Sequence, residues 1–142
     1  MKKLLKTTLL TAVLLFAATI VSAQTGKIVF DNSTHNFGSD VPEKGGDITH
    51  RFTFTNTGDA PVTIQQVTAS CGCTTPAWTK EPVAPGQQGF VDATYHPNNR
   101  PGQFTKSLTV TNNGDQNVII LTISGTVVSA PPVAVEDTVP NK

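Results

Sequence analysis

The chain has 142 residues, and its ten Lys and Arg residues equal its ten Asp and Glu residues in number. A balanced charge without a basic cluster excludes the electrostatic surface that nucleic-acid-binding proteins use. The length suits one domain with a single hydrophobic core.

The first 23 residues have the pattern of an export signal that is removed from the mature protein. Lysines precede the apolar stretch Leu9–Val21, and the small residues Val21-Ser22-Ala23 end it. Cleavage after Ala23 makes Gln24 the first mature residue. The alternative is an N-terminal membrane anchor, but the stretch is shorter than the roughly 20 residues that a spanning helix needs. We therefore expect residues 1–23 to be a cleaved signal peptide.

Export also determines the expected compartment. We expect the protein in the periplasm, in association with the outer membrane, or outside the cell, with no transmembrane segment left after cleavage. Such an oxidising compartment permits a disulfide between the two cysteines of the chain.

The rest of the chain has the composition of a β protein. Thr, Val and Ile dominate the ordered runs, and Gly, Pro, Asn and Asp separate them at short intervals. Helical periodicity is absent, and the pattern is typical of an all-β sandwich. A loop is expected over 40–47, and the proline-containing residues 129–142 are expected to form a disordered tail. The expected strands, in chain order, are 27–31, 35–38, 48–56, 62–69, 89–95, 103–111 and 117–127.

Period-two alternation identifies the side of each strand that faces the core. In 48–56 the aromatic residues share one face, while the threonines share the other. The alternation shifts within 62–69, which predicts a β-bulge at Gln65-Gln66. The dipeptide Asn113-Gly114 predicts a hairpin between the last two strands. The residues expected to be buried together are Phe52, Phe54, Leu108, Val110, Leu121 and Ile123.

Cys71 and Cys73 are the only cysteines, and one glycine separates them. So short a loop cannot join distant strands, and two ligands cannot complete a zinc site. Three states remain: a local disulfide, a close dithiol, or two small apolar side chains at a strand end. In an extended strand the residues lie about 6.6 Å apart along the axis, whereas a disulfide needs Cβ atoms about 3.5–4.5 Å apart. A positive φ at Gly72 would fold the segment into a turn, and the bridge would then be strained and easily reduced.

These states imply different functions. A close dithiol could be redox-active or hold a metal ion, whereas two sulfur atoms that only pack a strand-end turn would have a structural role. His35, His50 and His96 could supply a copper ligand, because thiolate and imidazole both suit copper, but they are scattered along the chain. No cofactor is predicted. No enzyme activity is predicted either, because Ser70 and Cys71 lack a nucleophile elbow and a glycine-rich oxyanion loop.

Two further residues bear on such a site. Trp78, the only tryptophan, is either an exposed recognition platform or a lid over one end of the core, and we expect a lid that partly covers the cysteines. Lys106 lies at an inward position of its strand and is expected to extend to a rim of the core. If it lay beside Cys71, it would favour the thiolate form of that cysteine.

Several short motifs occur in an order that is found in one known family. They are His35-Asn36-Phe37-Gly38, Phe52-Thr53-Phe54-Thr55-Asn56-Thr57-Gly58, Ser70-Cys71-Gly72-Cys73-Thr74-Thr75-Pro76, Pro85-Gly86 and Gly102-Gln103-Phe104. The chain thereby resembles the bacterial exported family called domain of unknown function fifteen-seventy-three, over Ile28 to Val128. The resemblance implies an immunoglobulin-like sandwich of about seven to eight strands, similar to hydin-type and major-sperm-protein-type domains. Those relatives are mostly interaction or assembly modules without catalysis, and the family has no agreed activity.

We therefore expect residues 24–128 to form a non-catalytic binding or structural module of the cell envelope. Its partner would be a protein or another envelope component, bound through loops or by strand addition at an open sheet edge. The alternative, from another class, is a small redox-active or copper-binding protein built on the Cys71-Gly72-Cys73 dithiol.

Overall fold

The computed structural model describes residues 23–129, so nearly all of the expected signal peptide and of the expected tail lie outside the described residues. The described residues contain no helix that is long and apolar enough to cross a membrane. They form nine strands: β1 (Ile28–Phe30), β2 (Thr34–Asn36), β3 (Val41–Pro42), β4 (Ile48–Asn56), β5 (Ile64–Ala69), β6 (Thr74–Trp78), β7 (Gln88–Tyr95), β8 (Gly102–Asn112) and β9 (Val118–Val128).

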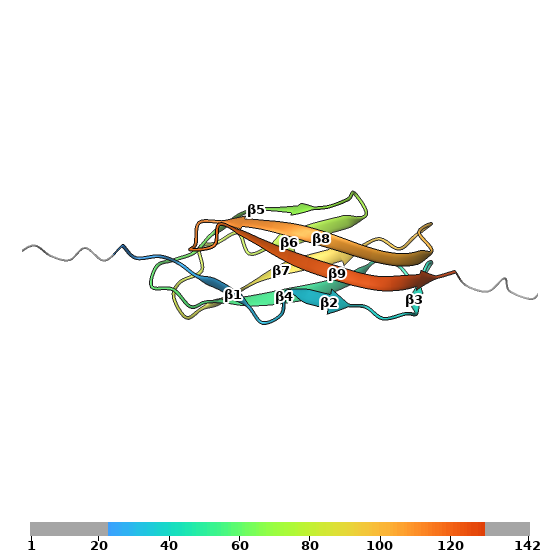
Figure 1. The fold of residues 1–142 in the computed structure, drawn as a ribbon, viewed down its shortest axis with the longest axis horizontal. Coiled ribbons are helices and arrows are strands. Elements are labelled where there is room, and N and C mark those ends of the chain that lie inside the picture. The colour runs from blue at the N-terminus through green and yellow to red at the C-terminus, as the bar shows by residue number, and fades with distance from the viewer. Residues whose placement is uncertain (1–22, 130–142) are drawn as a thin grey trace, which may run out of the picture.

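The strands build two sheets that face each other (Figure 1). One sheet has the order β1-β4-β7-β6, and the other has the order β2-β9-β8-β5 with β3 also beside β9. Most pairs are antiparallel, whereas β2 and β3 run parallel to β9. The N-terminal segment thus borders both sheets, since β1 pairs with β4 and β2 pairs with β9. The predicted all-β sandwich is confirmed.

The core lies between the sheets and consists of the inward residues of each long strand. The large buried residues include those that period-two alternation predicts to face the core, because successive side chains of a strand point to opposite faces. Phe52 is 1% exposed, and the other five predicted core residues are 0% exposed: Phe54, Leu108, Val110, Leu121 and Ile123. The predicted β-bulge is also present, as a register shift between Ile64 and Gln66.

The structure has two strands that the sequence pattern did not predict. β3 lies inside the expected loop and is only two residues long. β6 contains Pro76, which has no N–H to donate and therefore argues against a central strand. β6 is an edge strand, where a proline is tolerated. The predicted strand over 62–69 begins only at Ile64 in the structure.

Two buried asparagines hold the loops at the pole opposite the cysteines. Asn56 is 0% exposed, and its Nδ2 donates to the carbonyl oxygens of Ala60 and Val83, each at 2.8 Å. Asn112 is 1% exposed, and its Nδ2 donates to the Gln116 carbonyl at 2.8 Å. The predicted β8–β9 hairpin is therefore present, but Asn112 organises a loop longer than a two-residue turn.

The packing of Phe54 against Gly89 of β7 can be tested with a double mutant. A Cβ at Gly89 would overlap the Phe54 ring, so Gly89→Ala should destabilise the fold. Phe54→Ala should cost about 3–5 kcal/mol of unfolding free energy, as is usual for an emptied Phe site. The double variant should lose less than the sum, because the absent ring leaves room for the new methyl group. Urea denaturation measures all three values.

The matched control is Val29→Ala, because Val29 is 43% exposed, and it should change stability by less than about 1 kcal/mol. A Phe54→Ala loss of under about 1 kcal/mol, or strict additivity with Gly89→Ala, would contradict this packing.

Candidate functional site

The two cysteines lie where the chain crosses from one sheet to the other. β5 ends at Ala69 in the second sheet, and β6 begins at Thr74 in the first. Cys71 and Cys73 are joined by a disulfide, and their Cα atoms are 5.2 Å apart. The N–H of Thr74 donates to the Cys71 carbonyl at 3.4 Å and closes a turn over the same residues.

The prediction of a left-handed backbone conformation (positive φ) at Gly72 is wrong. Positive φ values occur at four other glycines and at Asn99 among the described residues, but not at Gly72. The turn uses ordinary backbone angles at its two central residues, and these already bring the cysteine Cα atoms closer than an extended strand allows. A bridge at this spacing therefore does not require glycine at position 72.

The two sulfur atoms have different surroundings. Cys73 is 6% exposed and belongs to the core, whereas Cys71 is only partly buried against it. The Cys73 N–H donates to Cys71 Sγ at 3.3 Å. Thr74 Oγ1 lies 3.9 Å from Cys71 Sγ and 4.0 Å from Cys73 Sγ. Cys71 is therefore the sulfur that is more open to an incoming group.

Lys106 of β8 lies one position beyond the hydrogen bonds that join β8 to the start of this turn. The β5–β8 register ends at Ala69 opposite Leu108. Beyond it, the Ser70 N–H donates to the Ser107 carbonyl at 2.9 Å, and the Ser107 N–H donates to Ser70 Oγ at 3.1 Å. Continued by one more position, this pairing sets Cys71 opposite Lys106. Lys106 is half-buried and has the inward parity of Leu108.

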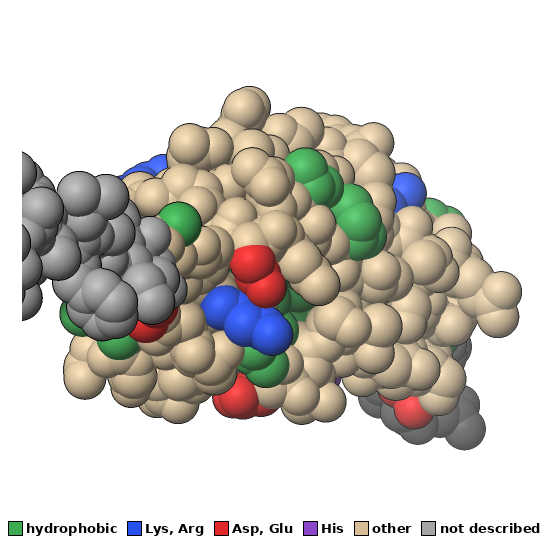
Figure 2. Space-filling view, turned by 60° about the vertical axis from the view of Figure 1, so that its left-hand side comes forward, with side chains coloured by type: hydrophobic (Ala, Val, Ile, Leu, Met, Phe, Trp, Pro, Cys, Tyr) green, Lys and Arg blue, Asp and Glu red, His purple; other side chains and the backbone are tan. Residues whose placement is uncertain are grey.

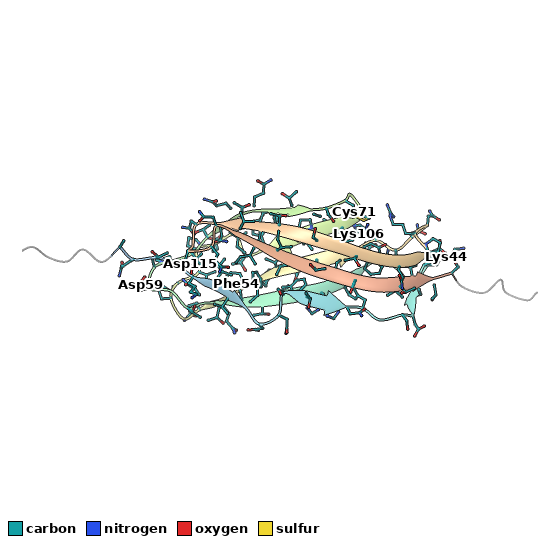
Figure 3. All side chains as sticks on the ribbon, in the orientation of Figure 1. Lys44, Phe54, Asp59, Cys71, Lys106 and Asp115 are labelled. Atoms are coloured by element: carbon teal, nitrogen blue, oxygen red, sulfur yellow. A yellow bond between two sulfur atoms is a disulfide. The ribbon has the colours of Figure 1, made fainter. Side chains whose placement is uncertain are left out.

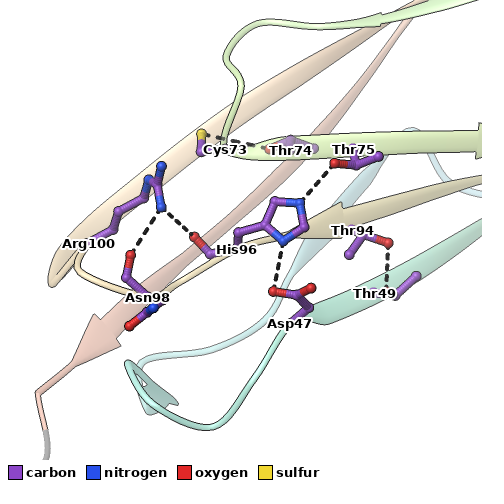
Figure 4. Close-up of polar contacts among 9 residues, drawn as sticks. All are labelled: Asp47, Thr49, Cys73, Thr74, Thr75, Thr94, His96, Asn98 and Arg100. Atoms are coloured by element: carbon purple, nitrogen blue, oxygen red, sulfur yellow. Dashed lines mark hydrogen bonds and ion pairs between the residues drawn. The ribbon is translucent and has the colours of Figure 1, made fainter.

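A polar relay lies at the same pole (Figure 4). Asp47 Oδ1 is 2.7 Å from Nδ1 of His96, and Nε2 of His96 is 2.8 Å from Oγ1 of Thr75. The backbone N–H of His96 donates to the Cys73 carbonyl at 2.9 Å. The relay therefore connects the loop before β4, the outer side of β6, and the residue after β7.

The order carboxylate, imidazole, hydroxyl is that of a hydrolase triad. A hydrolase also needs N–H groups aimed at a developing oxyanion. The backbone N–H groups of His96 and Thr74 already donate to the carbonyls of Cys73 and Cys71. These two N–H groups are thus occupied, and the relay ties the loop before β4 to β6 and to the residue after β7. The relay could not be predicted from the sequence, because its three residues are far apart in the chain and only the β6–β7 register brings Thr75 close to His96.

The other two histidines lie together at a different place. The rings of His35 and His50 stack with centroids 3.6 Å apart. Burial, together with the neighbouring His35, lowers the pKa of His50. The described residues contain no group of three His, Cys, Asp or Glu side chains that could hold a metal ion. The structure therefore brings none of the three histidines into a ligand set with the cysteines.

Trp78 lies at the other end of β6 from the cysteines. It is opposite Val91, about 13 Å along the strand from Thr74. Its ring is partly buried against the core, and Lys80 Nζ lies 2.9 Å from the ring centroid. The indole Nε1 has no hydrogen-bond partner among the described residues. The ring packs on the core and does not lie over the disulfide.

The chain belongs to the family described as "Protein of unknown function (DUF1573)", which matches residues 28–127. No curated protein matches the chain.

Solved structures share the fold at low sequence identity. A protein of unknown function from Porphyromonas gingivalis W83 is 14% identical with a TM-score of 0.63, over 78% of this chain and 50% of that one. The ASH/PapD-like domain 7 of human CEP192 is 10% identical with a TM-score of 0.59, over 81% of this chain and 97% of that one. The secreted serine protease VesC from Vibrio cholerae is 18% identical with a TM-score of 0.55, over 74% and 24%. The chain thus spans half of the first structure and a quarter of VesC, and the likeness shows an immunoglobulin-like β-sandwich.

The small size of the bridged loop predicts how far stability depends on it. In the chain-entropy account, a loop of about three residues stabilises by under about 2 kcal/mol. Replacing both cysteines with serine should therefore lower the unfolding free energy by less than about 2 kcal/mol. Denaturation with and without a reductant measures the same quantity in the unmodified chain.

The double-serine variant is also the control, because a reductant should leave its unfolding free energy unchanged. A loss of about 4 kcal/mol or more, equal on reduction and on substitution, would show that the bridge is a structural cross-link after all.

Proposed function

We propose that the protein is an exported, non-catalytic binding module of the cell envelope that binds an extended segment of a partner protein by strand addition. The single observation that carries the proposal is an unpaired edge on β8. β5 pairs with β8 only between Leu108 and Asn112, whereas β9 pairs with β8 from Gly102 to Thr111. Among residues 23–129, the part of β8 near Gly102 therefore has a strand on one side only.

The hydrogen-bonding groups of this edge point away from β9. The N–H and C=O of Ser107 are both used on the β5 side, by Ser70. Along a strand these groups alternate in direction, so the N–H and C=O of Gln103 and Thr105 point to the same side. An extended peptide placed there would continue the line of β5 and satisfy them, which is the basis of strand addition.

The surface chemistry supports recognition through the backbone more than through charge. Charged residues are 14% of the chain, and Figure 2 shows a face on which charged side chains are few. Long-range electrostatic attraction is therefore weak, and the main-chain groups of an open edge supply the specific polar contacts.

The test uses a photo-crosslinking residue at Gln103 of the protein expressed in its own envelope. It should give adducts with a polypeptide, and adding Thr105→Pro should remove them, since proline lacks the N–H that the partner would receive. The β9 ladder keeps its bonds, because the lost N–H points away from β9. Circular dichroism checks that the variant folds.

The matched control places the same photo-crosslinker at Thr55, on the outer face of the other sheet. Equal adducts at Gln103 and Thr55, or adducts that survive Thr105→Pro in a folded variant, would exclude strand addition at this edge.

The location of the protein has its own test. Envelope fractionation followed by intact mass should find a mature chain that begins at Gln24, because the lysines, the apolar stretch and the small residues stand in the order of a cleaved signal. A protein that retains Met1 or Lys2 in the envelope fraction would show that the segment is an anchor.

A further inference from the structure

We infer that the Cys71–Cys73 disulfide is an exchangeable redox site that oxidises dithiols, with Cys71 as the attacked sulfur and Lys106 as a positioning residue. The substrate class is a pair of neighbouring thiols on another polypeptide or on a small molecule. The inference does not depend on strand addition at β8.

The two sulfur atoms differ in their exposure to solvent. Thiol–disulfide exchange requires a thiolate to approach one sulfur along the bond and expel the other. Cys71 is partly exposed at the surface of the crossover, whereas Cys73 is 6% exposed inside the core. An incoming thiolate therefore reaches Cys71 Sγ, and Cys73 Sγ is the sulfur that leaves.

The fold does not depend on the Cys71–Cys73 disulfide. The disulfide spans two positions in sequence, so it constrains the unfolded chain very little. The crossover is held independently by the Thr74 N–H on the Cys71 carbonyl and by the Ser70–Ser107 hydrogen bonds. The reduced form can therefore keep the same backbone, as a reversible site requires.

Lys106 is a charged residue at a position where an apolar side chain would be expected. It occupies an inward position in a strand whose other inward members, including Phe104 and Leu108, are buried and apolar. It forms no ion pair with any described residue. Its place opposite Cys71 in the continued β5–β8 register brings a positive charge to the side of the sulfur that must carry negative charge when it is released. A nearby lysine favours the thiolate and makes the thiol a better leaving group.

The exchange is balanced in two steps. The first thiolate of the dithiol forms a bond to Cys71 Sγ, the Cys71–Cys73 bond breaks, and the electron pair leaves on Cys73 Sγ, which takes a proton from water. Thr74 Oγ1, 4.0 Å from this sulfur, can turn its hydroxyl toward it. The second thiolate then attacks the substrate sulfur of the mixed disulfide and expels Cys71 as a thiolate. The dithiol is oxidised by two electrons, and both cysteines are reduced.

The test begins with the mature chain in buffers of reduced and oxidised glutathione. Rapid alkylation followed by intact mass gives the fraction of disulfide in each buffer. We expect a reversible titration within the glutathione range and, with dithiothreitol, one equivalent of oxidised dithiothreitol per equivalent of protein. A bridge that stays oxidised throughout the glutathione range would overturn the inference.

The role of Lys106 is tested in a Cys73→Ser background, where Cys71 is the only thiol. The rate of alkylation by iodoacetamide against pH reports the thiolate. Lys106→Met should lower the rate near neutral pH by about three- to tenfold and shift the profile to higher pH. Lys106→Arg should restore it, because it keeps the charge.

Lys44→Met is the matched control, since Figure 3 places Lys44 away from Cys71 at the end of the molecule. A purely structural lysine would alter stability and leave the pH profile in place. Equal profiles for the Lys106→Met and Lys44→Met variants would overturn the role of Lys106.

Discussion

The chain must pass from one sheet to the other within four residues after β5, and most of the candidate chemistry follows from this constraint. Packed sheets are about 10 Å apart, so the chain has to leave β5 at Ala69 and turn at once to enter β6 at Thr74. Because β5 stops at the crossover, the first residues of β8 have no second neighbouring strand in the described part of the chain. The crossover also places Cys71 opposite Lys106 in the continued register and brings Thr75 to His96. The open edge and the disulfide therefore share one origin.

The strands with strict alternation could be predicted from the sequence, because each has one buried and one exposed face. Ile48–Asn56 is the clearest example, and its bounds are those of β4. β3 and β6 could not be predicted in this way. β3 has two residues, too few for a period, and Pro76 argues against a strand until its edge position is known.

The candidate site likewise has residues that the sequence predicts and residues that it does not. The cysteine pair and the inward parity of Lys106 are local properties and are visible in the sequence. The contacts of Asp47, Thr75 and His96 depend on which strands are neighbours, and no spacing along the chain encodes them. The expected position of Trp78 near the cysteines rested on closeness in sequence. An extended β6 carries the ring away from them instead.

The parallel pairing of β2 and β3 with β9 bears on when the domain can fold. These pairs join residues 34–42 to residues 122–128, so almost the whole chain must be present before they form. Such non-local contacts form late, because the entropy of closing a long loop has to be overcome first. In a chain synthesised from its N-terminus, this order delays completion of the fold until the last strand is available. The topology therefore makes the last strand to be synthesised the one that completes the second sheet, so a chain that lacks β9 cannot form it.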